Sequence, residues 1–147
     1  EIVSFSESSE GGFREMPVIP GAQEAISSMR NAGCRLVVIS KCSSSPRTVR
    51  MREENLVSAF GADAFDEIVC LGLDQSKSED LRRFGPSLFI DDLPANVTDG
   101  QEAGHRSVLM NRSHNRNFVT SGADGMEVLD GWDGFRIAHD SPRPESF

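Results

Sequence analysis

Apolar and polar residues follow a helical pattern, then a strand-like pattern, in the first readable part of the chain. Between residues 20 and 33 the apolar positions recur at helical spacing, at Ala22, Ala25, Ile26 and Met29. Gly33 is placed to end this helix. Residues 35–40, RLVVIS, form a short β-branched run, which is typical of a strand covered on both faces. The pattern predicts an amphipathic helix that leads into a parallel strand.

The alternation continues to residue 110. Serines 43–45 offer N-caps and Pro46 suits a first helical turn, which predicts a second helix towards Leu56. The later predicted elements are a strand at 65–71, a helix at 79–84, a strand at 88–90, a helix at 94–104 and a strand at 107–110. Alternating strands and helices predict an α/β fold, a three-layer Rossmann-like parallel sheet with helices on both faces. We find no insertion of the size of a cap domain, so we expect little or no cap.

The 147 residues suit one domain, which we expect over residues 1–135. Residues 1–16 are either its first strand or a linker. Beyond Asn111 the pattern loosens, and Asp-Gly turn dipeptides surround one short element at 128–129. Residues 136–147, rich in Ser, Pro and charge, are expected to be a flexible tail.

Composition and charge limit the classes of partner that the chain is expected to bind. The chain is 37% hydrophobic and 26% charged with a net charge of −8, which is typical of a soluble globular protein and disfavours nucleic acid and acidic membranes. Its apolar runs are far shorter than a membrane span needs. Cys34, Cys42 and Cys70 lack the paired spacing of a zinc site and indicate thiols in a reducing compartment, which we expect to be the cytoplasm. The oligomeric state stays open.

Candidate metal-binding and phosphate-binding residues lie where predicted strands end. In open parallel sheets ligands bind beyond the carboxyl ends of the strands. Ser40 ends one strand, Asp91 and Asp92 end another, and Lys77 starts the helix before the acidic pair. Two adjacent carboxylates can hold Mg²⁺, and a hydroxyl and an ammonium group can bind a phosphoryl group. We therefore expect metal ligation by the acidic pair and phosphate binding by Ser40 and Lys77.

Two segments carry a resemblance to a known superfamily. Residues 17–40, PVIPGAQEAISSMRNAGCRLVVIS, and residues 76–97, SKSEDLRRFGPSLFIDDLPANV, resemble motifs two to four of the haloacid dehalogenase-like phosphohydrolases. The resemblance implies a phosphatase fold, a Mg²⁺ cofactor and a small phosphorylated partner. It also implies the roles already given to Ser40, Lys77, Asp91 and Asp92. VLMNRSHNRN at 108–117 is more weakly similar to the 5′(3′)-deoxyribonucleotidase branch, which would place His114 and Asn115 near a substrate phosphate.

The nucleophile motif of that superfamily is missing. Its members carry Asp-x-Asp after the first strand, where one carboxylate attacks phosphorus and the other acts as general acid and base. If residues 2–5 are that strand, the two positions fall at Ser6 and Ser8. Neither serine has a neighbouring base, so covalent phosphoryl transfer should fail. The other interpretation is that the true motif precedes Glu1.

Three functions therefore stay open. The first is a catalytically impaired domain that keeps a Mg²⁺ and phosphate site. The second is an active Mg²⁺-dependent phosphatase of small phosphate esters or nucleotides, whose N-terminal motif is absent from these residues. The third is a non-catalytic interaction domain, in which Asp91 and Asp92 only cap the next helix.

Overall fold

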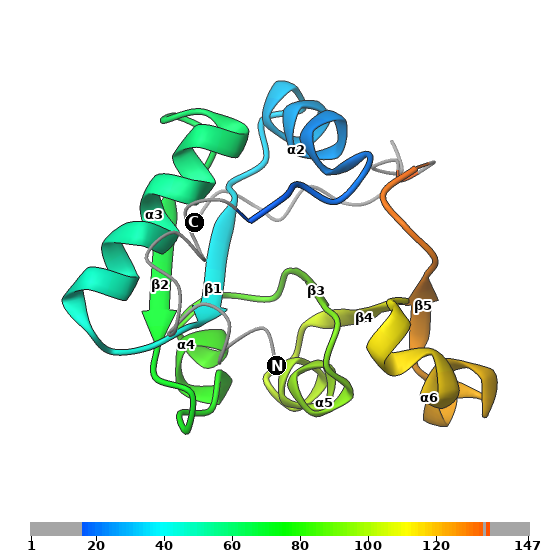
Figure 1. Cartoon of the computed structure of the whole chain (residues 1–147). Helices are drawn as coiled ribbons and strands as arrows, with labels where there is room; N and C mark the ends of the chain where they lie inside the picture. The colour runs from blue at the N-terminus through cyan, green and yellow to red at the C-terminus, as the bar shows by residue number, and fades with distance from the viewer. Residues whose placement is uncertain (1–15, 134, 136–147) are drawn as a thin grey trace. The chain divides into compact units, whose positions relative to one another are not determined.

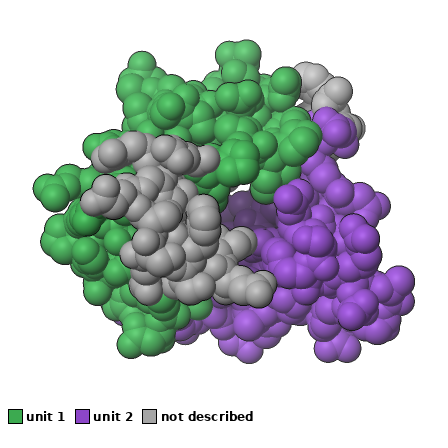
Figure 2. Space-filling model, in the orientation of Figure 1, with its two compact units in different colours: residues 1–75 green, residues 76–147 purple. Residues whose placement is uncertain are grey.

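The computed structural model describes residues 16–133 and 135. The chain divides into two compact units, unit 1 up to Gln75 and unit 2 from Ser76 (Figure 2). Ser6, Ser8 and the predicted tail lie outside the described residues. None of the helices in the described part is long and apolar enough to cross a membrane. A single domain over residues 1–135 stays a prediction.

Unit 1 alternates helices and strands as expected. Its elements are α2 (Ala22–Asn31), β1 (Val37–Lys41), α3 (Pro46–Phe60) and β2 (Glu67–Leu71) (Figure 1). Strands β1 and β2 pair in parallel, with Ser40 opposite Cys70. Pro46 occupies the first turn of α3, where its missing N–H costs no hydrogen bond. The helical face of α2 buries Ala22, Ala25 and Met29, which confirms three of its four predicted apolar positions.

Unit 2 contains a second parallel sheet. Its elements are α4 (Ser78–Arg83), β3 (Leu88–Asp91), α5 (Pro94–Glu102), β4 (Arg106–Met110), η1 (Ser113–Asn115), α6 (Arg116–Thr120), η2 (Ala123–Gly125) and β5 (Glu127–Leu129). The strand order is β3-β4-β5, with all pairs parallel (Figure 1). Parallel strands flanked by helices confirm the predicted α/β class. The short element expected at 128–129 is a strand, whereas α6 was not predicted.

The core of unit 2 lies between its sheet and helices. Val97, Leu109 and Ala123 form a buried cluster. Four partly buried side chains pack against it, namely Phe118, Val119, Met126 and Val128. Helix α5 approaches the sheet closely at Gly100. A Cβ atom there would overlap the hydroxyl of Ser107 and the ring of Phe89. Only glycine permits this packing distance.

His105 fastens the start of β4 to the elements before it. Its Nδ1 accepts a hydrogen bond from the Ser87 amide (3.1 Å), so its Nε2 carries the proton and donates to the Leu81 carbonyl (2.6 Å). The side chain is buried. Replacing His105 by leucine should therefore lower the free energy of unfolding by about 2–3 kcal/mol, because both backbone groups lose this partner. Urea unfolding checks this, with His114→Leu at an exposed position as control. An equal loss in both variants would contradict the assignment.

An exposed ion pair joins β4 to β5. Arg106 donates to both carboxylate oxygens of Glu127, at 3.0 and 2.5 Å. The hydrogen bond from Arg106 lowers the pKa of Glu127, and Glu127 raises the pKa of Arg106. Because the folded pKa of Glu127 is lowered, the stabilisation is complete at neutral pH and is lost as pH falls through that pKa.

Solvent screening keeps this contribution small. Both side chains are exposed, so we expect at most about 0.5 kcal/mol. The difference in unfolding free energy between the parent chain and Glu127→Gln should shrink towards zero as pH falls through the lowered pKa of Glu127, and it should shrink in high salt. Urea unfolding at a series of pH values measures it. A difference that is independent of both pH and salt would show that the pair contributes nothing electrostatic.

Candidate functional site

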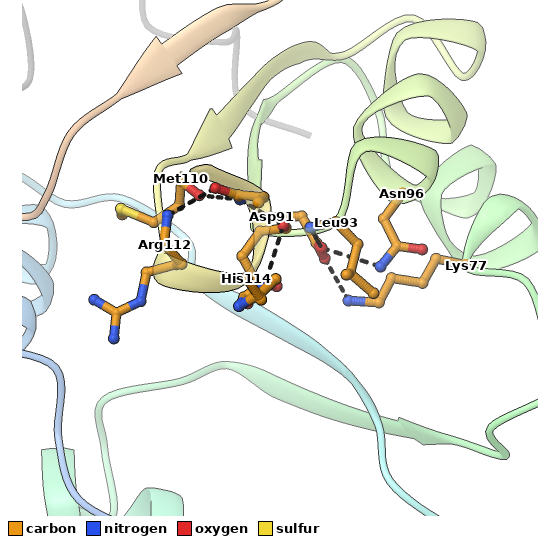
Figure 3. Close-up of polar contacts among 9 residues, drawn as sticks. Lys77, Asp91, Leu93, Asn96, Met110, Arg112 and His114 are labelled. Atoms are coloured by element: carbon orange, nitrogen blue, oxygen red, sulfur yellow. Dashed lines mark hydrogen bonds and ion pairs between the residues drawn. The ribbon is translucent and has the colours of Figure 1, made fainter. Parts of the chain in front are cut away.

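The predicted acidic pair ends β3 and its two carboxylates have different surroundings. Asp91 is the last residue of β3, and its side chain is 6% exposed. Oδ2 lies 2.6 Å from Nζ of Lys77, and Oδ1 accepts from the Leu93 amide (2.9 Å) and from Nδ2 of Asn96 (3.0 Å). Figure 3 shows Lys77 and Asn96 reaching Asp91 from one side. Three donors thus offset the cost of burying this charge.

Lys77 is held as firmly as its partner. It is the N-cap residue of α4, and its side chain is 9% exposed. Its ammonium group also lies 5.9 Å from the centre of the Phe89 ring, within the range of a cation–π contact. An ammonium group has three N–H donors, and Asp91 takes one. The remaining donors can bind an anion.

Asp92 is the exposed member of the pair. Its side chain is 47% exposed, and Oδ2 lies 3.1 Å from Nε2 of His114. Its backbone oxygen accepts hydrogen bonds from Nδ2 of Asn115 (2.8 Å) and Nε2 of His114 (3.3 Å). Asp92 therefore presents its carboxylate to solvent while its backbone is held in place.

Asn115 connects the ends of two strands. Its Nδ2 donates both to the carbonyl of Asp92 and to that of Met110, the last residue of β4, at 2.8 Å each. Its Oδ1 accepts from the Arg112 amide (2.9 Å). The Asn115 side chain is buried. The segment after β4 was expected near a substrate phosphate, but its contact with Asp92 was not predicted.

The two carboxylates suit a Mg²⁺ ion in number and type. Mg²⁺ is usually bound by one or two carboxylates, and water and substrate phosphate oxygens complete its shell. Asp92 offers an exposed carboxylate. Asp91 can offer only Oδ2, because its Oδ1 already accepts two hydrogen bonds. Within residues 16–133 no group of three or more His, Cys, Asp or Glu residues could hold a metal.

Ser40 belongs to unit 1, within β1. Its hydroxyl oxygen accepts a hydrogen bond from Nε of Arg52 (3.1 Å), and Nη1 of the same guanidinium donates to Oδ1 of Asn55 (2.9 Å). Burial lowers the pKa of Arg52, while the thiols of Cys70 and Cys42 act in the opposite direction. Arg52 was not predicted, because nothing in the spacing of α3 links it to Ser40. Joint phosphate binding by Ser40 and Lys77 stays a prediction.

Comparison with known proteins bears on the fold. The chain shares its fold with a solved phosphatase. The crystal structure of D,D-heptose 1,7-bisphosphate phosphatase from Burkholderia thailandensis matches with a TM-score of 0.62 and 22% identity, covering 82% of this chain and 84% of that chain. No protein-family model and no curated protein matches the sequence. The likeness confirms the Rossmann-like α/β fold and gives no support to the nucleotidase branch.

Proposed function

We propose that this chain is a haloacid dehalogenase-like domain that binds Mg²⁺ and a small phosphate ester without turning the ester over. The observation that carries the proposal is the buried Lys77–Asp91 pair beside the exposed Asp92 at the end of β3. A buried ion pair adds little stability compared with apolar residues of similar size. A binding role explains better why an ammonium group and two carboxylates meet there.

In the proposed site, different side chains of unit 2 would bind the metal and the phosphate. Asp92 would bind the metal directly, and Asp91 would contribute Oδ2 while it fixes the position of the Lys77 ammonium group. Bound Mg²⁺ would neutralise charge on the phosphate oxygens. Lys77 would donate to another phosphate oxygen. Phosphate binding by Ser40 stays a separate prediction for unit 1.

The fold supports a phosphorylated ligand. The solved phosphatase named above acts on a heptose bisphosphate, so we would test sugar phosphates as well as nucleoside monophosphates as ligands. The expected lack of turnover rests on the sequence, which contains no Asp-x-Asp. The resemblance places Ser6 and Ser8 at the two positions of that motif, and a serine there lacks the carboxylate that attacks phosphorus.

An active phosphatase is the second candidate, because the shared fold is that of a phosphatase. It would require a nucleophile that the resemblance does not locate in these residues, or one supplied by residues before Glu1. Structure and fold are equally compatible with both candidates, so phosphate release must separate them.

The test combines binding and turnover. Calorimetry with Mg²⁺ and inorganic phosphate should give binding that Asp92→Asn abolishes. Asp63→Asn, an exposed carboxylate of unit 1, should leave it intact. Phosphate release from sugar phosphates and nucleoside monophosphates should not exceed the release measured when a chelator has removed Mg²⁺.

Each other outcome identifies an alternative. Release that requires Mg²⁺ and is lost in Asp92→Asn would establish the active phosphatase. Absence of both binding and release would refute the site and leave an interaction domain, in which Asp91 only fixes the Leu93 amide just before α5.

A further inference from the structure

Four sulfur-containing side chains gather in unit 1. Cys42 and Met51 form a buried cluster, with exposed fractions of 0% and 5%. Met16 and Cys70 pack against it. Neither the proposed function nor the predicted phosphate site uses these side chains.

Strand geometry places the two cysteines on the same face. Ser40 lies opposite Cys70 in the parallel register, and Cys42 follows Ser40 by two residues. Residues two apart in a strand point to the same side of the sheet. The Cys42 amide donates to the Leu71 carbonyl (3.0 Å), which continues the pairing past the end of β1. The Cys42 and Cys70 thiols are therefore diagonal neighbours, and the Cys70 side chain packs against the buried cluster of Cys42 and Met51.

This placement disfavours a disulfide. Strands about 4.8 Å apart that rise about 3.3 Å per residue separate diagonal Cα atoms by roughly 8 Å. A disulfide needs Cα atoms within about 7 Å. Both cysteines are free thiols. A metal ion between two sulfur atoms, with bonds of about 2.3 Å, instead needs sulfur atoms about 4 Å apart, a requirement that two side chains packed in one cluster can meet.

The ligand set selects the kind of ion. Thiolate and thioether sulfur are soft ligands that favour Cu(I) over Mg²⁺ or Ca²⁺. Zinc sites use Cys, His or carboxylate ligands, usually four of them. No third His, Cys, Asp or Glu completes such a group among the described residues.

Arg52 balances the charge that such a complex would carry. One Cu(I) ion with two thiolates has a net charge of −1. The Arg52 guanidinium interacts electrostatically with both Cys42 and Cys70, and it donates to Sδ of Met16 at 3.8 Å. A buried anionic centre is stable when a cation lies beside it.

We propose that Cys42 and Cys70 bind one Cu(I) ion, with the thioethers of Met16 and Met51 as further soft ligands. Two sulfur–copper bonds form, two S–H bonds break, and the two protons pass to solvent. The weak hydrogen bond from Cys42 Sγ to the Ser43 carbonyl (3.5 Å) is lost in the process. The half-buried Cys70 gives the ion its route of entry.

The test is an anaerobic titration of the whole chain with Cu(I) in competition with the chromophoric chelator bicinchoninate. We expect the chain to withdraw one equivalent of Cu(I) from the chelator. Cys42→Ala and Cys70→Ala should each abolish this binding, whereas Cys34→Ala should retain it. Arg52→Gln should weaken it about 10- to 100-fold, as expected for a neighbour outside the ligand set.

X-ray absorption on the unmutated chain keeps the test independent of how the variants fold. A copper shell of sulfur atoms only is expected. Nitrogen or oxygen ligands, absence of competition with the chelator, or binding that survives loss of either cluster cysteine would each overturn the proposal. Tighter binding of Zn²⁺ than of Cu(I) at the same thiols would overturn the choice of ion.

Discussion

Replacing Lys77 by methionine should lower the free energy of unfolding by about 3–5 kcal/mol. The two side chains of the Lys77–Asp91 pair are 9% and 6% exposed, so the variant leaves a carboxylate buried without its cation. The hydrogen bonds from Leu93 and Asn96 to Asp91 remain, but alone they offset only part of the free-energy cost of burying the carboxylate. Urea unfolding followed by circular dichroism measures the loss.

A double-mutant cycle supplies the control. Asp91→Asn in the Lys77→Met background removes the buried charge, so the double variant should be more stable than Lys77→Met alone. If the losses of the two single variants simply added, the pair would not be coupled, and Lys77 would stabilise α4 in some other way. The exposed pair Arg83–Asp80 (3.2 Å) gives a reference, because its removal should cost less than about 1 kcal/mol.

Asn115→Leu should cost about 3 kcal/mol of stability and should also weaken the Mg²⁺ binding that we propose at Asp92. The substitution preserves approximate volume, but it leaves the carbonyls of Asp92 and Met110 and the Arg112 amide without their buried partner. Because the same amide group holds the backbone of Asp92, the carboxylate should also lose its fixed position. Urea unfolding and calorimetry with Mg²⁺ measure the two effects.

Asn117 is the matched control for this experiment. It is exposed on α6, so Asn117→Leu should change stability by less than about 0.5 kcal/mol and leave Mg²⁺ binding unchanged. A stability loss in Asn115→Leu without any change in Mg²⁺ binding would restrict Asn115 to a structural role. Equal losses in both variants would refute the special position of Asn115.

Local patterns predicted the elements well because they depend on neighbouring residues. The helical spacing after Gly21 gave a helix at 20–33, and α2 spans Ala22–Asn31. The run RLVVIS gave a strand at 35–40, and β1 spans Val37–Lys41. Helix α6 was missed, since its five residues show too little apolar periodicity to mark a helix.

The candidate residues were predictable where they lie at the ends of predicted elements. The end of β3 pointed to Asp91 and Asp92, the start of the preceding helix pointed to Lys77, and the resemblance implied the same roles. Their opposite exposures could not be predicted, since they depend on Asn96 and on residues more than twenty positions away. Asn115 contacts Asp92 across 23 positions, and no spacing rule connects the two. Ser6 and Ser8 remain predictions.

Gly100 links the packing of α5 to the candidate site of unit 2. The ring of Phe89 fills the space beside the Gly100 Cα atom, and the Lys77 ammonium group lies over the same ring. A side chain at position 100 would push α5 away from the sheet, and Asn96 lies on that helix. A saturation screen for ligand binding should therefore find position 100 as intolerant as the site itself. Such a screen would mark as functional a residue that never meets the ligand.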